Sequence, residues 1–171
     1  MPANFERSQL DAYLRNLTWD DVLRPHVLAA ARALVERGHV ASIGLLGFCW
    51  GGCPVAHALA DAELTAALPL RCGAIAHPSL SLEQRVFGRD PAALLARVRA
   101  PLLLLPAKND PAEYRGAWLE ALQGAQPASR CVEFNEMTHG WVPRGDLGDA
   151  AVARDVQRAI DEIVAFFNAH L

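Results

Sequence analysis

The stretch Gly47-Phe48-Cys49-Trp50-Gly51-Gly52 decides the fold of this chain. It follows the apolar run Ile43-Gly44-Leu45-Leu46 and precedes Val55-Ala56-His57-Ala58-Leu59-Ala60, whose small apolar side chains are typical of a packed helix. A strand that turns sharply into a helix, with a nucleophile at the tip and glycines around it, is a nucleophile elbow. Glycines are needed there because the tip residue has strained backbone and neighbouring side chains would collide with the strand or the helix. The sequence therefore predicts a strand over 43–48 and an elbow with Cys49 at its tip.

Cys49 has two interpretations. A thiol is a strong intrinsic nucleophile, and a helix N-terminus favours its thiolate form. Free cysteine is also among the most buried residue types, so a cysteine beside a strand can be a simple core residue. The preceding strand, the third glycine and the following helix favour the functional interpretation. Cys53 lies four residues further on, and it either packs in the helix or forms a redox pair with Cys49.

Length and composition indicate one globular enzyme-like domain. The chain has 171 residues, of which 52% are hydrophobic and 20% charged, enough to bury a sizeable core. The net charge is −3, and without a basic cluster we expect no nucleic-acid partner. No apolar stretch reaches the length of a membrane span, and residues 1–7 lack the apolar core of a signal peptide. The cysteines form no C-x-x-C pair, so we expect reduced thiols and a cytoplasmic location.

Strands and helices alternate along the chain. After a helix that begins near Thr18 and ends at Gly38, the apolar runs predict strands over 43–48, 72–76, 101–106 and 131–134. Helices are expected after the elbow, around 91–98, over 112–122 before Gly124, and over about 150–169. This alternation predicts a three-layer α/β/α sandwich with a mainly parallel sheet and helices on both faces. We treat 1–171 as one domain, with a helical segment over 1–42 and the catalytic part over 43–171.

A catalytic cysteine needs a base, and the base needs an orienting acid. Asp110 follows the third predicted strand, and His139 follows the fourth. Their chain order is that of an α/β-hydrolase, and the carboxyl ends of parallel strands meet at one edge of the sheet. The alternatives are that Asp110 only caps a helix and that His139 is a surface loop residue. The other histidines compete for this role: His26, His39, His57, His77 and His170. Of these, His57 and His170 fall on predicted helices and His39 precedes the elbow strand, which are poor placements for a base.

Four further residues are candidates for lining the site. His77 ends the second predicted strand and either contacts substrate or is a loop histidine without a role. Arg144 can hold a substrate carboxylate with its two-pronged guanidinium, or it can form an exposed ion pair with Asp146. Trp50 and Trp141 are either apolar walls of the cleft or ordinary packing residues. Since histidines and cysteines never occur at the spacing of a closed zinc site, we expect no metal.

At these residues the chain resembles the dienelactone hydrolase family of the α/β-hydrolase superfamily. The similarity lies in the 47–52 elbow, in Lys108-Asn109-Asp110, and in Thr138-His139-Gly140 with Arg144 beyond. It implies hydrolysis of a small ester or lactone by a Cys49–His139–Asp110 triad through a thioester acyl-enzyme, without a cofactor. It also implies that the backbone N–H of Trp50 donates to the oxyanion.

The chain departs from the family ahead of the elbow. Family members have several strands there, whereas residues 1–42 read mainly as helix. The sheet is therefore expected to lack its first strands, a second oxyanion donor and an acidic residue that helps to activate the cysteine. The open strand edge is then covered by the N-terminal helix, paired with a second copy in a homodimer, or left open in an incomplete gene product. Two alternatives to the hydrolase stay open: an impaired α/β domain with a binding or assembly role, and a thiol redox protein.

Overall fold

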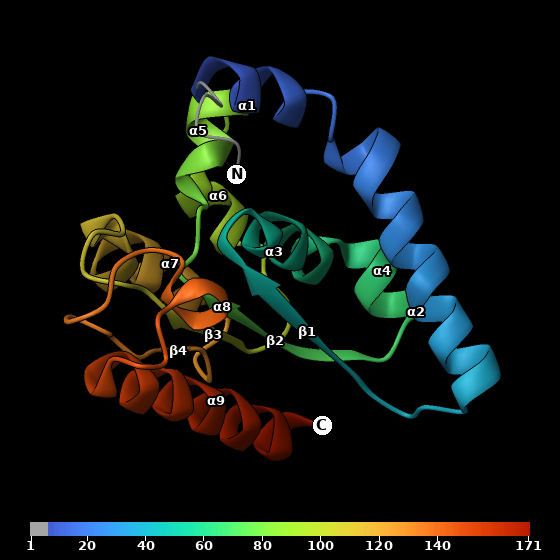
Figure 1. The fold of residues 1–171 in the computed structure, drawn as a ribbon. Coiled ribbons are helices and arrows are strands. Elements are labelled where there is room, and N and C mark those ends of the chain that lie inside the picture. Colours follow the sequence, from blue (N-terminus) through green and yellow to red (C-terminus); the bar gives the residue numbers. More distant parts are fainter. Residues whose placement is uncertain (1–6) are drawn as a thin grey trace.

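A four-stranded parallel sheet forms the centre of the molecule. The computed structural model describes residues 7–171 (Figure 1). Its strands are β1 (Ile43–Phe48), β2 (Leu70–Ala76), β3 (Leu102–Leu105) and β4 (Arg130–Cys131), and they lie side by side in that order. All four leucines of β3 are fully buried, as expected for a parallel strand covered on both faces. The predicted parallel α/β sheet is confirmed.

Helices cover both faces of this sheet. On one face lie α3 (Gly52–Ala60), α4 (Ala62–Ala67), α6 (Pro91–Leu95) and α7 (Ala117–Ala125), and on the other lies α9 (Ala150–His170) (Figure 1). The core is accordingly split into two clusters, one containing Leu59, Leu102 and Leu104 and the other Leu103, Leu105 and Phe166. The three-layer sandwich expected from the sequence is therefore present. Within residues 7–171, no helix has both the length and the apolar character needed to cross a membrane.

The remaining helices are short or lie before β1. They are α1 (Arg7–Leu14), a π-helical turn (Trp19–Leu23), α2 (Arg24–Gly38), a 3-10 turn (Cys49–Gly51), α5 (Ser81–Phe87), a 3-10 turn (Ala112–Arg115) and α8 (Trp141–Arg144). The helix predicted over 112–122 is thus divided by the non-helical Gly116 into a 3-10 turn and α7, and α7 continues through Gly124. The last predicted strand is also shorter than expected, since β4 ends at Cys131 and Phe134 makes only an isolated bridge with Ala107.

The strand that leads into the elbow is the edge of the described sheet. On β1, Leu46 and Phe48 keep 44% and 37% of their surface exposed. The N-terminal helices pack elsewhere, with α2 beside α4 and the Arg24 guanidinium 2.7 Å from the Asp61 carboxylate (Figure 1). Within residues 7–171, β1 therefore has a paired strand on one side only, which is β2.

Candidate active site

The turn after β1 has the backbone of a nucleophile elbow. Cys49 has a φ of 54°, a left-handed backbone conformation that residues other than glycine rarely adopt. A Cβ atom on Gly47 would lie 2.5 Å from the Gly51 carbonyl oxygen, and one on Gly52 would collide with Ile75 on β2. At Gly51, by contrast, a Cβ would meet nothing within 4 Å. The close turn therefore requires glycine at 47 and at 52, whereas the collision expected at Gly51 does not occur.

Asp110 and His139 come together at the carboxyl end of β3. The Asp110 carboxylate lies 2.6 Å from His139 Nδ1 through Oδ1, and its Oδ2 accepts the Ala107 N–H at 2.7 Å. The Asn109 side chain accepts the backbone N–H of His139 at 2.7 Å, which fixes the loop that carries the imidazole. Since Asp110 is only 7% exposed and both its oxygens are engaged, its carboxylate orients the imidazole instead of capping the next helical turn.

Ser79 connects this pair to the cysteine. Its hydroxyl lies 3.4 Å from Cys49 Sγ and 3.4 Å from His139 Nε2. Its backbone N–H donates to the Cys49 carbonyl at 3.2 Å. Ser79 was not predicted as a site residue, although it lies just beyond the carboxyl end of β2, the neighbour of the elbow strand. That position was the signal that could have identified it.

The pKa values of the cysteine and the histidine move in opposite directions. The pKa of Cys49 is lowered to about 5, first by His139 and then by His77 and Ser79, against the effect of burial. The pKa of His139 is raised to about 9, first by the hydrogen bond with Asp110 and then by Cys49. Each group stabilises the charge of the other, so the arrangement favours a thiolate beside an imidazolium between these two values.

The other thiols have the opposite character. Burial raises the pKa of Cys53 well above its ordinary value and raises the pKa values of Cys72 and Cys131 to about 11. All four cysteines are free thiols, and the Cys53 thiol faces the Ser79 carbonyl oxygen at 3.6 Å. A high pKa and burial are typical of a structural cysteine. Cys49 is thus the one thiol of the described residues with the properties of a nucleophile.

His77 and Trp141 lie beneath the site. The His77 ring is only 1% exposed, and neither of its nitrogens has a hydrogen-bond partner among the described residues. Its influence on the Cys49 sulfur therefore comes from proximity and not from a closed hydrogen bond. The ring stands edge-on to His139, with ring centres 4.9 Å apart, and lies 6.5 Å from Trp141. Trp141 is itself buried, at 4% exposure, and packs on Phe134.

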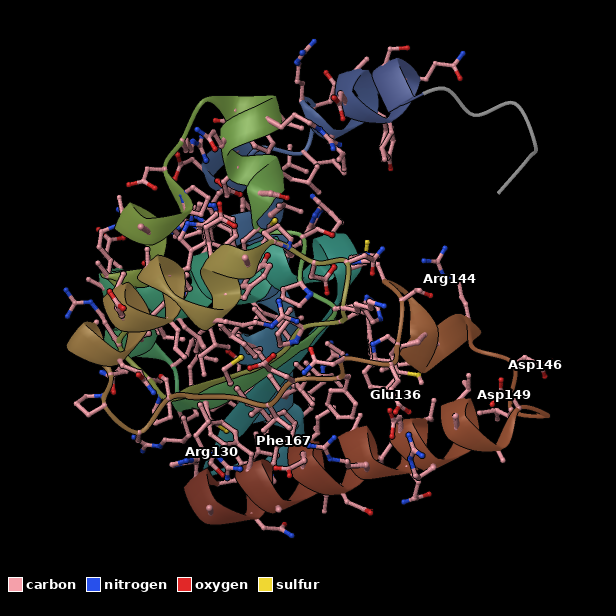
Figure 2. The ribbon with its side chains drawn as sticks, turned by 90° about the vertical axis from the view of Figure 1, so that its left-hand side faces the viewer. Arg130, Glu136, Arg144, Asp146, Asp149 and Phe167 are labelled. Carbon is pink, nitrogen blue, oxygen red and sulfur yellow. The ribbon has the colours of Figure 1, made fainter. Side chains whose placement is uncertain are left out.

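A cavity of about 510 Å³ opens beside His139. Its lining includes Trp141 and Arg144, and Figure 2 shows Arg144 on the outer side of α8, near the loop that carries Asp146. Within residues 7–171, no ion pair joins Arg144 to Asp146, and the Asp146 carboxylate instead accepts the Gly148 N–H at 2.9 Å. The guanidinium is therefore not neutralised by its expected loop partner.

The family model described as the dienelactone hydrolase family matches residues 6–171. The chain belongs to the dienelactone hydrolase family.

Relatives show how much of a longer protein the chain resembles. An uncharacterized AIM2 family protein of Schizosaccharomyces pombe is 27% identical over 157 residues, which are 90% of this chain and 55% of that protein. An acylaminoacyl peptidase structure from Pyrococcus horikoshii matches with a TM-score of 0.69 at 17% identity, covering 98% of this chain and 30% of that one. A second, uncomplexed structure of this peptidase matches with a TM-score of 0.56 at 19% identity, covering 75% and 24%. These structures establish the α/β-hydrolase fold, and the family member described here spans about half the length of its curated relative.

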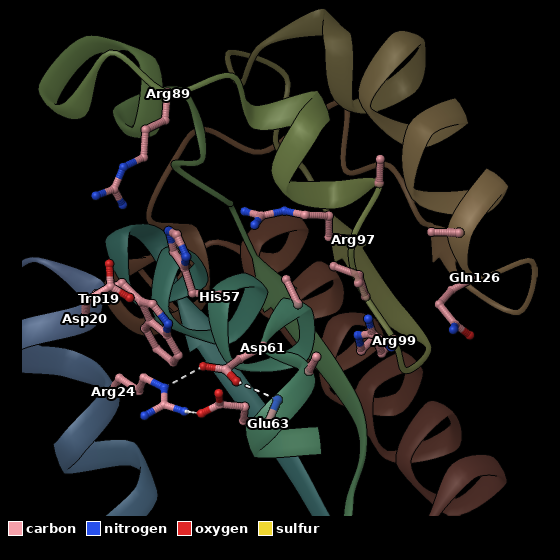
Figure 3. Close-up of a pocket in the computed structure, with 15 residues that line it drawn as sticks. Trp19, Asp20, Arg24, His57, Asp61, Glu63, Arg89, Arg97, Arg99 and Gln126 are labelled. Carbon is pink, nitrogen blue, oxygen red and sulfur yellow. Dashed lines mark hydrogen bonds and ion pairs between the residues drawn. The ribbon is translucent and has the colours of Figure 1, made fainter. Parts of the chain in front are cut away.

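A larger cavity of this family member lies away from the elbow. It has a volume of about 1180 Å³ and is located at the C-terminal end of α3 (Figure 3). There Trp19 stacks on His57 with ring centres 5.3 Å apart, and Arg24 binds both Asp61 and Glu63. None of the predicted site residues lines it. Among the described residues, no group of three or more His, Cys, Asp or Glu side chains is arranged to hold a metal ion.

Proposed function

We propose that the chain is a hydrolase of small esters or lactones in which Cys49 is the nucleophile, His139 the proton carrier and Asp110 the orienting acid. The observation that carries the proposal is the unbroken series of contacts from Asp110 through His139 and Ser79 to Cys49. These groups come from loops at the carboxyl ends of successive parallel strands, where α/β sheets place their active sites. Membership of the dienelactone hydrolase family supports the same chemistry.

The reaction begins with the thiolate of Cys49. Its sulfur attacks the substrate carbonyl carbon, and the carbonyl π electrons move to the oxygen, which becomes an oxyanion. When the tetrahedral intermediate collapses to the thioester, the leaving alkoxide takes a proton from the His139 imidazolium. His139, now neutral, removes a proton from water, and the resulting hydroxide attacks the thioester. Departure of the acid restores the thiolate and the imidazolium.

Activation of the cysteine is supported by residues within the chain. The family's additional acidic residue was expected to be missing, but the pKa of Cys49 is already low through His139, His77 and Ser79. For the oxyanion, we propose the backbone N–H of Trp50 as one donor, since the first N–H groups of a helical turn have no acceptor within the turn. The sheet is expected to lack the family's second oxyanion donor, and loss of one such donor lowers the rate of hydrolysis by roughly a hundred- to a thousandfold. We therefore expect slow turnover.

Substrate binding is assigned to the cavity beside His139. In this proposal, Arg144 binds a carboxylate of the substrate and Trp141 forms the apolar floor of the cavity. His77 is buried, does not line the cavity, and acts on the Cys49 thiol instead. Arg144 is exposed and can reach an anionic group with two parallel hydrogen bonds. A small carboxylated ester or lactone is the substrate class that this arrangement favours.

Hydrolysis of a small activated aryl ester tests the proposal. We expect slow turnover by the purified chain and none above background by Cys49→Ala, because Cys49 is the only proposed acyl acceptor. Cys131→Ala is the matched control, since it removes a thiol whose pKa is raised, and its turnover should equal that of the unmodified chain. Equal rates for Cys49→Ala and the unmodified chain, with both proteins folded, would exclude the hydrolase.

A second candidate function is assembly through the open edge of β1. Leu46 and Phe48 expose apolar surface on this strand, and an unpaired edge is a template for strand addition. In this proposal a second copy pairs with the edge to form a homodimer. Light scattering would show a dimer that dissociates on Leu46→Lys, whereas a monomer at all concentrations would exclude it.

A further inference from the structure

The Ser79 hydroxyl lies within 3.4 Å of both reacting groups of the proposed site. The hydrogen bonds that the structure records run from Cys49 Sγ to the Ser79 hydroxyl and from that hydroxyl to His139 Nε2, each at 3.4 Å. A hydroxyl has one proton to donate and two lone pairs to accept with. It is therefore able to donate to one neighbour and accept from the other at the same time.

The directions of these bonds follow from Asp110. A carboxylate only accepts, so the 2.6 Å contact places a proton on His139 Nδ1. In the charged state, Nε2–H then donates to the Ser79 oxygen, and the Ser79 O–H donates to the thiolate. In the neutral state, the Cys49 S–H donates to the Ser79 oxygen, and the Ser79 O–H donates to the unprotonated Nε2. Both states satisfy every donor and acceptor of the three groups.

We propose that Ser79 is a catalytic residue whose hydroxyl bridges Cys49 and His139 and stabilises the thiolate and the imidazolium together. The neutral state becomes the charged state when one proton passes from Sγ to Oγ and another passes from Oγ to Nε2. The sulfur keeps the electron pair of its S–H bond, and the serine is unchanged at the end. This inference rests on the proposed function for its role in turnover, but not for its effect on the thiol.

The backbone holds Ser79 in place independently of its hydroxyl. Its N–H donates to the Cys49 carbonyl at 3.2 Å, and its carbonyl accepts the Leu82 N–H at 3.0 Å. The next residue is also fixed, because the Leu80 N–H donates to the buried Tyr114 hydroxyl at 2.7 Å. Replacing Ser79 with the smaller alanine therefore removes the bridging hydroxyl and leaves the loop intact. His77 and His139 are the other titratable groups that act on this thiol.

The test is the pH dependence of Cys49 alkylation by iodoacetamide in the full chain. The unmodified chain should show a midpoint near pH 5, and Cys49→Ser should show no reaction in this range. In Ser79→Ala the midpoint should rise by about one pH unit, the size of a single hydrogen bond to a charged group. Ser79→Thr keeps the hydroxyl and should restore the original midpoint. The matched control is Ser81→Ala, at the first residue of α5, which should behave as the unmodified chain.

Ester hydrolysis gives the second readout. In Ser79→Ala, kcat should fall by about tenfold to a hundredfold with little change in KM, because the lost contact involves the reacting atoms and not the substrate. An alkylation midpoint that stays the same in Ser79→Ala, or that moves equally in Ser79→Ala and Ser79→Thr, would overturn the inference.

The two proposals can fail separately. If Cys49→Ala abolishes hydrolysis while the Ser79→Ala midpoint is unmoved, the hydrolase stands and the serine bridge is wrong. If Cys49→Ala leaves hydrolysis unchanged while Ser79→Ala still shifts the midpoint, the bridge stands and the hydrolase is wrong.

Discussion

Replacing Asp110 with asparagine should make the Cys49 thiol less reactive without changing its position. The Asp110 carboxylate accepts the Ala107 N–H at 2.7 Å and meets His139 Nδ1 at 2.6 Å. An asparagine must turn its oxygen toward Ala107, because the reverse orientation would place two N–H donors face to face in a buried position. Its NH₂ group then faces Nδ1. That contact is favourable only when Nδ1 is unprotonated, so the imidazole is held neutral with its proton on Nε2.

The magnitude follows from the pKa of His139. Its neighbours raise this pKa from 6.5 to about 9, and Asp110 is the largest contributor. One hydrogen bond to a charged group contributes about 1.5–3 kcal/mol, equivalent to roughly one to two pKa units. Since the imidazolium in turn holds the thiolate, the pKa of Cys49 should rise by about one unit or more in Asp110→Asn. Turnover should fall by roughly a hundredfold to ten-thousandfold, the range expected when a triad histidine is held in the wrong tautomer.

Alkylation by iodoacetamide measures the first effect and aryl ester hydrolysis the second. The matched control is Asp161→Asn, which removes the same charge from the exposed side of α9 and should leave both readouts unchanged. Circular dichroism confirms that each variant is folded. A midpoint that remains near pH 5 in folded Asp110→Asn would refute the reasoning, because the imidazolium would then not depend on the carboxylate.

Two further predictions concern the elbow and the ion pair. Gly47→Ala should lower the free energy of unfolding in urea by about 1–3 kcal/mol, because its Cβ meets the Gly51 carbonyl oxygen at 2.5 Å. Gly51→Ala, with open space and a φ of −56°, should be neutral or stabilising by about 0.4–1 kcal/mol; equal losses in both would contradict the role of the close turn. The value of kcat/KM for an alkyl ester should rise as pH increases through about 5, where the Cys49 thiolate forms, and fall above about 9, where the His139 imidazolium loses its proton. A profile that rises only near pH 8–9 would show that the thiol is not activated.

Local chemistry made the central elements predictable from the sequence. The run over 43–48 forms β1 with those bounds, and the glycines at 47 and 52 leave the space that the turn needs. Strand β3 and helix α9 were predictable from short-range pattern alone, because β3 is a continuous run of leucines and α9 has an apolar stripe. The short helices α4, α5 and α8 lack such a pattern, and tertiary packing stabilises them. The final strand was predicted too long because only two residues of it pair regularly with β3.

Contacts between distant segments determine the rest of the site. The sequence by itself gave the chain order of Cys49, Asp110 and His139, because each follows a recognisable strand, and it gave the elbow. Only the tertiary structure brought Ser79 between Cys49 and His139, which are 30 and 60 residues away along the chain. A serine carries no local pattern that distinguishes a bridging hydroxyl from a loop residue. Its role depends on where β2 ends relative to its neighbours, and strand pairing over the whole sheet determines that.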